Sequence, residues 1–275
     1  MPRPRYEINC SILFTELPRL QRPAAAKAAG FDAVEFWWPF DSAMPADAEI
    51  TAFERAITDA GVALVGLNFF AGDMPGGDRG VVSWPGRTAE FHDNVEVAVG
   101  IGERLGCRAF NALYGNRVDG TSPDEQDALA VQNLAFAASA AARIGGVALV
   151  EPVSGAPRYP LRTADDALGV IDRVRAETGA AALGFLCDLY HLAVNGDDVD
   201  AVVATHASRV AHVQIADAPG RGEPGTGELD LAGHVDKLYA AGYRGWIGCE
   251  YKPTGASADS FGWLPPDQRG SGGMR

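Results

Sequence analysis

The amino-acid sequence predicts an α/β protein built as a single (β/α)8 TIM barrel. The chain has 275 residues, and a barrel of this kind needs about 250. Short apolar runs alternate along the chain with longer, Ala-rich stretches of helical spacing. Strands that alternate with helices form a parallel sheet, and eight such units close naturally into a barrel with the helices outside.

Eight apolar runs have the length and composition of buried strands. They are Tyr6–Ser11, Ala33–Phe36, Ala63–Asn68, Ala109–Ala112, Val147–Glu151, Gly184–Asp188, Val210–Ile215 and Trp246–Glu250. Seven stretches between them have helical spacing, and several begin after Ser or Asp or end before Gly, as helices do. They are Leu17–Ala29, Ala46–Ala60, Thr88–Leu105, Pro123–Ile144, Ala164–Glu177, Val199–Ala207 and Leu231–Ala241.

A doubly wound open sheet is the alternative fold, and the missing GxGxxG motif after the first strand weighs against it. No linker or change of composition interrupts residues 1–255. We therefore expect one domain over residues 1–268, with a short C-terminal segment behind the last strand. Residues 269–275, which end in GSGGMR, are expected to form a flexible tail.

Composition limits the classes of function. The net charge of −13 argues against nucleic-acid binding, which depends on Lys and Arg. The four cysteines form no CxxC pair, so we expect buried free thiols in a reducing cytosol. The N-terminus has no apolar signal-peptide core, and no apolar run approaches the roughly 20 residues of a membrane span. These features predict a cytoplasmic protein.

Four successive strands in the second half end in polar side chains: Glu151, Asp188, Gln214 and Glu250. The C-terminal ends of barrel strands meet at one mouth, where barrel enzymes have their active sites. Three carboxylates at one mouth would repel each other unless a cation neutralised them. Each residue alone could merely cap a strand or pair with Arg, but four at the same depth predict a site for one divalent metal. The donors are all oxygen atoms, which favours Mg²⁺ or Mn²⁺.

Further polar residues flank this predicted site. His212 precedes Gln214 by two residues, so we expect it one layer deeper, supporting the ligands. His191 lies just beyond a strand end and is expected to face the substrate. Arg221, in a loop rich in Gly and Pro, could hold a substrate carboxylate, with Lys252 as the second candidate. A solvated surface Arg is the other interpretation.

Aromatic residues crowd the other strand-end loops. They could wall a small pocket or form an oligomer interface, and the sequence leaves both open, as it does the role of Trp263. They are Trp37, Trp38, Phe40, Phe69, Phe70, Trp84 and Tyr114.

The segments ALVEPVS, LCDLYH, AHVQIADAPGRGEPGTGELD and GYRGWIGCEYKP resemble the hydroxypyruvate isomerase family, part of the xylose-isomerase-like barrels. The earlier segments NCSILFTELP, AAGFDAVEFWWPFD and NFFAGDMPGGDRG agree with it, and the resemblance runs to about Gln268. It implies that Glu151 and Glu250 form an acid–base pair and that the four strand-end residues bind one metal.

The resemblance also implies that His191 and Arg221 lie near the substrate. Related ketose 3-epimerases usually carry His where this chain has Gln214. Two departures flank the pocket: Trp37 lies in a loop that usually reads FxFPYD, and Ser154 stands where Asn is common. Both bear on the identity of the substrate more than on the chemistry.

The expected reaction interconverts hydroxypyruvate and tartronate semialdehyde through an enediolate, with a small anionic hydroxy-carbonyl compound as substrate. A 2-oxo-tetronate isomerase or a ketose 3-epimerase would use the same chemistry on a longer substrate. A DNA-repair barrel like endonuclease IV needs many histidines and a basic face, and the chain has five His and a charge of −13. A non-catalytic carbohydrate-binding barrel and a homo-oligomer stay open.

Overall fold

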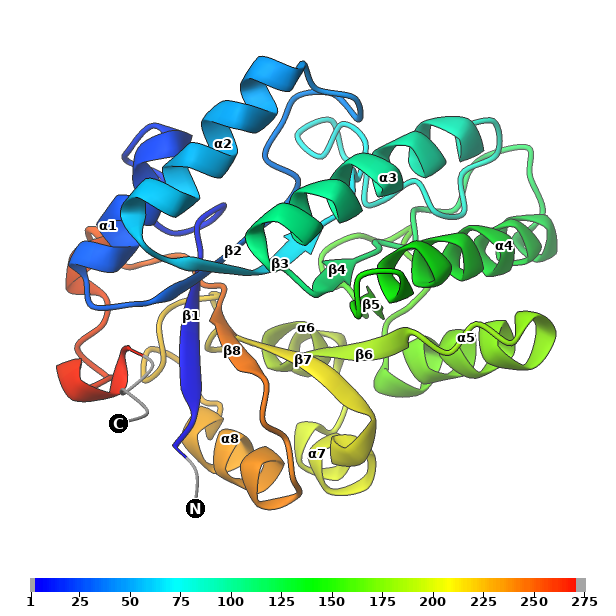
Figure 1. Cartoon of the computed structure of the whole chain (residues 1–275). Helices are drawn as coiled ribbons and strands as arrows, with labels where there is room; N and C mark the ends of the chain where they lie inside the picture. Colours follow the sequence, from blue (N-terminus) through cyan, green and yellow to red (C-terminus); the bar gives the residue numbers. More distant parts are fainter. Residues whose placement is uncertain (1–2, 271–275) are drawn as a thin grey trace.

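The computed structural model describes residues 3–270, which form a closed barrel of eight parallel strands with helices around it (Figure 1). The strands follow chain order, and β8 pairs with β1, so every strand has two neighbours. The predicted TIM barrel is confirmed. The strands are β1 (Arg5–Asn9), β2 (Ala33–Phe36), β3 (Ala63–Asn68), β4 (Ala109–Asn111), β5 (Val147–Val150), β6 (Leu183–Asp188), β7 (Val210–Ile215) and β8 (Trp246–Cys249).

All seven predicted helices are present, with small shifts at their ends. The first is shorter than expected because a 3-10 turn, Arg19–Gln21, precedes it and Pro23 lies in its first turn. The α-helices are α1 (Arg22–Ala28), α2 (Asp47–Ala60), α3 (Thr88–Leu105), α4 (Pro123–Ala142), α5 (Ala164–Thr178), α6 (Leu189–Asn195), α7 (Val199–His206) and α8 (Leu231–Ala240).

Helix α6 follows β6 directly and was not predicted from the sequence. Its seven residues are too few to show a helical period. The side chain of Asp188 caps it by accepting hydrogen bonds from the backbone N–H groups of Tyr190 and His191, and Gly196 ends it with φ of 84°. The cap fixes Asp188 and brings His191 back over the mouth of the barrel.

Two glycines make room for polar side chains inside the barrel. A Cβ added at Gly66 in β3 would lie 2.8 Å from Oε2 of Glu35, and one at Gly248 in β8 would lie 2.8 Å from Oε1 of the same carboxylate. Real Cβ atoms do not approach other atoms this closely. The barrel interior can therefore hold a carboxylate at a level where most barrels pack apolar side chains.

The C-terminal segment packs back on the barrel. Phe261 is fully buried, with its ring 4.8 Å from that of Phe31, and the ring of Trp263 meets Tyr6 edge-on at 5.3 Å. Within the expected tail, Arg269 donates hydrogen bonds to the backbone carbonyls of Ala29, Phe261 and Leu264. Residues 271–275 of that tail lie outside the described residues.

The four cysteines, Cys10, Cys107, Cys187 and Cys249, are buried free thiols. Within residues 3–270, no helix combines the length and the apolar character that a membrane crossing requires.

Candidate active site

The four polar strand-end residues meet at one mouth of the barrel. Glu151 follows β5, Asp188 ends β6, Gln214 lies in β7 and Glu250 follows β8. All four are buried, and the strand register puts Gln214 opposite both Asp188 and Gly248. Three acidic groups thus share one small region with little access to water.

Crowding and burial change the acidity of these carboxyl groups. Burial, Glu250 and Asp188 together raise the pKa of Glu151 well above its usual value. Burial, with Asp188 and Glu35, raises the pKa of Glu250 to about 7, although Arg221 opposes the change. Burial also raises the pKa of Asp188. Groups that titrate near neutral pH are suited to proton transfer.

Arg221 supplies the positive charge among these carboxylates. Its Nη2 atom contacts Oε2 of Glu250 and lies 4.0 Å from Oδ2 of Asp188, and its guanidinium lies 5.2 Å above the ring of Tyr190. The residue has a positive φ of 61°, an uncommon backbone state that clusters at functional sites. Its backbone carbonyl accepts a hydrogen bond from the backbone N–H of Lys252. The side chain of Lys252 is exposed and lines a cavity above the mouth.

His191 faces the same carboxylates as a neutral side chain. Burial and Arg221 lower its pKa to about 3. Its Nδ1 atom accepts a hydrogen bond from the backbone N–H of Ser154 at 3.0 Å, so its proton is on Nε2. That Nε2 lies 3.6 Å from Oδ2 of Asp188 and 3.9 Å from Oε1 of Glu151. In this tautomer the Nε2–H group of His191 points toward the carboxylates at the mouth, at distances too long for a hydrogen bond.

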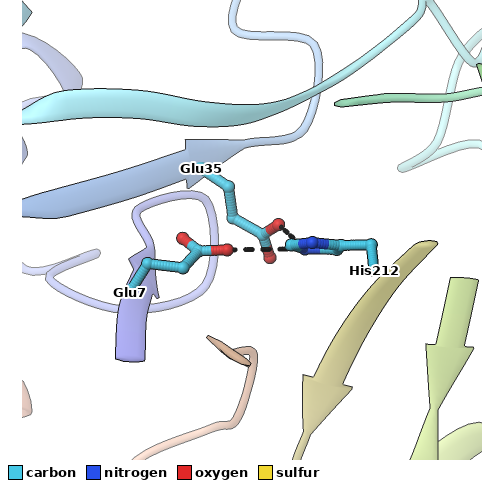
Figure 2. Close-up of side chains that lie close together, drawn as sticks. All are labelled: Glu7, Glu35 and His212. Carbon is cyan, nitrogen blue, oxygen red and sulfur yellow. Dashed lines mark hydrogen bonds and ion pairs between the residues drawn. The ribbon is translucent and has the colours of Figure 1, made fainter. Parts of the chain in front are cut away.

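A second polar cluster lies one layer deeper (Figure 2). His212 points from β7 toward Glu7 of β1 and Glu35 of β2. Its Nε2 lies 2.9 Å from Oε2 of Glu35 and 3.5 Å from Oε1 of Glu7. Although burial opposes it, hydrogen bonding to the two glutamates raises the pKa of His212 to about 10. The expected depth of His212 agrees with this position.

Neither of these glutamates was predicted from the sequence, nor were three further contacts at the mouth. Glu7 and Glu35 interrupt apolar strands, and a charge within an apolar run is the signal that could have found them. Nδ2 of Asn111 donates to Oε2 of Glu151 at 2.6 Å. Oε1 of Glu250 accepts from Nε1 of Trp37 at 2.5 Å and from Nδ2 of Asn9 at 3.0 Å.

The donor atoms fit a divalent metal. Glu151, Asp188 and His191 offer atoms within 4.8 Å of one another, as do Glu7, Glu35 and His212. Either buried cluster could therefore bind a cation once the Nε2 atom of its histidine carries no proton. The side-chain oxygen of Gln214 is buried at the mouth without a hydrogen-bond partner among residues 3–270. Buried oxygen atoms without partners are costly unless a cation or water satisfies them.

A cavity of about 1130 Å³ opens above the mouth. Glu151, His191, Arg221 and Glu250 line its floor, with Lys252 at its edge. Of the seven aromatic residues that could form a pocket wall or an oligomer interface, four line this cavity: Trp37, Trp38, Phe40 and Phe70.

The other three aromatic residues do not line this cavity and make other contacts. Phe69 is buried and its ring stacks 5.6 Å from that of Phe110. Trp84 lies beneath Arg87, with the guanidinium 4.8 Å from its ring. The hydroxyl of Tyr114 donates to Asp127. Phe69 and Tyr114 belong to the core, which explains their position better than a pocket wall does.

Known proteins resemble this chain over almost its whole length. Residues 23–266 match the family model described as Xylose isomerase-like TIM barrel. A Streptomyces coelicolor protein, assigned provisionally by its name as a hydroxypyruvate isomerase, is 56% identical over 270 residues, covering 96% of this chain and 97% of its own. The hydroxypyruvate isomerase of Escherichia coli is 33% identical, covering 95% and 98%.

A 2-oxo-tetronate isomerase of Cupriavidus necator is 35% identical and covers 96% of this chain and 98% of its own. Among solved structures, the Brucella melitensis protein titled AP endonuclease, family 2 superposes with a TM-score of 0.86 at 32% identity, covering 96% and 98%. These matches extend over almost the whole chain at identities that show the family. The chain therefore belongs to the hydroxypyruvate isomerase family of xylose isomerase-like TIM barrels.

Proposed function

We propose that this protein interconverts hydroxypyruvate and tartronate semialdehyde, with Glu151 and Glu250 as the acid–base pair. The observation that carries the proposal is the pair of buried glutamates at the ends of β5 and β8, each with a raised pKa, around one mouth. Glutamates tuned toward neutral pH can both accept and return a proton.

We further propose that Glu151, Asp188, Gln214 and Glu250 hold one divalent cation, Mg²⁺ or Mn²⁺. Their all-oxygen donor set and the unpartnered Gln214 oxygen support this assignment. When bound, such a cation supplies Lewis-acid stabilisation of negative charge that develops on a carbonyl oxygen. The buried carboxylates supply the compensating negative charge.

The chain's own groups would carry the proton transfer. One glutamate removes a proton from C3 of hydroxypyruvate, which carries the hydroxyl. The hydroxyl proton then passes from O3 to O2, and the enediolate takes up a proton at C2, which leaves an aldehyde at C3 and a hydroxyl at C2. Nε2–H of His191 is available to donate a hydrogen bond to a substrate oxygen, because its other nitrogen accepts from Ser154. Trp37 and Asn9 hold Glu250 in place, while the aromatic wall reduces contact of the reacting carbons with water.

A longer substrate is the second candidate, because the cavity of about 1130 Å³ exceeds the needs of a three-carbon acid. A relative at 35% identity is named a 2-oxo-tetronate isomerase. The four-carbon acid would use the same acid–base pair and fill more of the space toward Lys252, which lies at the cavity edge.

One experiment tests both candidates. Chelator-treated protein, with Mg²⁺ or Mn²⁺ restored, is incubated in D₂O with hydroxypyruvate or with a 2-oxo-tetronate, and the products are followed by NMR. Metal-dependent tartronate semialdehyde with deuterium at C2 is expected. Turnover of the four-carbon acid alone would replace the substrate and keep the acid–base pair. No turnover of either acid, with metal bound, would refute the proposed reaction.

A further inference from the structure

We propose that Glu35 is a positioning residue: its carboxylate determines which way the side-chain amide of Gln214 faces and thereby presents the Gln214 oxygen to the cation. This inference rests on the proposed metal site. It assigns a role to a residue of β2, in the first half of the chain, whereas the four proposed ligands lie at the ends of β5 to β8.

Two amide groups donate to the same oxygen of Glu35. Oε1 accepts a hydrogen bond from Nε2 of Gln214 at 2.7 Å and another from Nδ2 of Asn9 at 2.9 Å. A side-chain amide nitrogen only donates, so it cannot serve as a metal ligand. Gln214 can therefore bind a cation only through Oε1, and only if that oxygen faces the mouth.

The charge of Glu35 excludes the reversed amide. If Gln214 were turned by 180°, its Oε1 would lie against Oε1 of Glu35, and two acceptors would meet in a buried site without a hydrogen between them. In the observed orientation Nε2 lies against Glu35, and Oε1 has no hydrogen-bond partner within residues 3–270. The carboxylate thus leaves one orientation for the ligand.

Glu35 fixes Asn9 in the same way. The amide of Asn9 donates to Glu35 and also to Oε1 of Glu250 at 3.0 Å, while its own oxygen accepts from the backbone N–H of Ser11 at 3.0 Å. One buried carboxylate therefore orients an amide beside the cation site and a donor on the proposed catalytic Glu250.

The deeper layer keeps Glu35 in place. His212 binds its second oxygen at 2.9 Å, and the missing side chains of Gly66 and Gly248 leave it room. His212, Glu7 and Glu35 also have the donor atoms for a cation of their own. We favour the supporting role because the Nε2 atom that such a cation would need is already hydrogen-bonded to Glu35.

The test compares E35Q with E7Q, a matched control. Both substitutions remove one buried carboxylate from the same histidine, but Glu7 makes no side-chain hydrogen bond to Gln214 or Asn9 in the described structure. Mn²⁺ affinity of the metal-stripped proteins is measured by titration calorimetry without substrate. E35Q is expected to bind Mn²⁺ about 10- to 100-fold more weakly, and E7Q to bind within about threefold of the wild type.

A swapped variant, E35Q/Q214E, separates positioning from general stability. A carboxylate at position 214 presents an oxygen whichever way it turns, and the new amide at position 35 can donate to it. Mn²⁺ affinity should return to within about tenfold of the wild type, whereas a purely structural role of Glu35 predicts no recovery. If E35Q does not fold, the swapped variant still decides, since it should fold and bind.

Wild-type affinity in E35Q, an equal loss in E7Q, or a folded swapped variant that does not bind would each overturn the inference. The outcome is distinct from that of the proposed function. Suppose that the wild type and the three variants show the expected Mn²⁺ affinities but the wild type does not isomerise hydroxypyruvate. That result would refute the reaction and support the role of Glu35. A wild type that binds no Mn²⁺ would refute both.

Discussion

The indole nitrogen of Trp37 donates a hydrogen bond to Oε1 of Glu250 over 2.5 Å. This contact joins the loop after β2 to the end of β8. The same carboxylate oxygen also accepts from Asn9 at 3.0 Å. Trp37 therefore holds Glu250 in position, and because donors to a carboxylate favour its charged form, we expect loss of this contact to raise the pKa of Glu250.

Replacement of Trp37 should therefore impair catalysis. We expect W37F to lower kcat/KM about 10- to 100-fold, because a hydrogen bond to a charged group contributes about 1.5–3 kcal/mol. On the acid side of the pH–activity profile, the pH of half-maximal activity should be higher for W37F than for the wild type. W38F is the control, since Nε1 of Trp38 donates to the backbone carbonyl of Ser42 instead. Equal effects of both substitutions in steady-state assays would contradict this role.

The two proposed catalytic glutamates can be separated from metal binding. E151Q and E250Q keep the shape and one oxygen of each side chain but cannot carry the proton. We expect kcat to fall about 10²- to 10⁴-fold in each variant. Bound metal is determined in the same samples by elemental analysis. Turnover near the wild-type rate with metal bound would disprove the acid–base assignment.

The stability of the metal-free protein should depend on Arg221. R221M removes the guanidinium that lies between Glu250 and Asp188, which leaves buried carboxylates without a cation. We expect the free energy of unfolding in urea at pH 8 to fall by about 3–5 kcal/mol, with part of the loss recovered by added Mn²⁺. R209M removes a partly exposed ion pair with Asp172 and should cost at most about 1 kcal/mol.

The raised pKa of Glu250 predicts a pH dependence of stability. Its pKa in the folded protein is about 7, against an ordinary value of 4.5. Between these values the folded state binds more protons than the unfolded state, so stability falls as pH rises through this window. His191, with a pKa of about 3, contributes in the opposite direction below pH 6.5.

Comparison with E250Q isolates the glutamate from these other groups. The metal-free wild type should lose thermal stability relative to metal-free E250Q as pH rises from 5 to 8, measured as the difference in Tm. Saturating Mn²⁺ should stabilise the wild type more at pH 8 than at pH 5, because it favours the charged carboxylates. A difference in Tm that stays constant with pH would contradict the raised pKa.

The sequence predicted the barrel well because its strands are continuous apolar runs separated by helices with clear ends. β2, β3 and β7 have the predicted bounds. α6 was missed because it follows β6 without a break and is short. Its N-terminal cap is Asp188, a residue already interpreted as a strand end, so the local pattern gave no separate start signal.

The mouth of the site could be predicted because parallel strand ends converge wherever the barrel closes. The contacts between those residues could not be predicted from the sequence. The role of Arg221 toward a substrate carboxylate stays a prediction. Its contact with Glu250 was not foreseen, because it joins residues 29 positions apart and depends on the path of the loop. Glu7 and Glu35 were overlooked because a strand buried on both faces gives no alternation to mark an inward charge.

Gly248 limits the order in which substitutions at neighbouring positions can accumulate in this sequence. A Cβ at this position would lie 2.8 Å from Oε1 of Glu35, 3.0 Å from Oε1 of Glu7 and 3.0 Å from Cγ of Gln214. A mutation to alanine would thus be rejected in a background that keeps Glu35, yet could become acceptable once residue 35 had become smaller, because only small shifts would relieve the two remaining contacts at 3.0 Å. In a lineage of related sequences, side chains at position 248 should follow the loss of Glu35 on β2 rather than precede it.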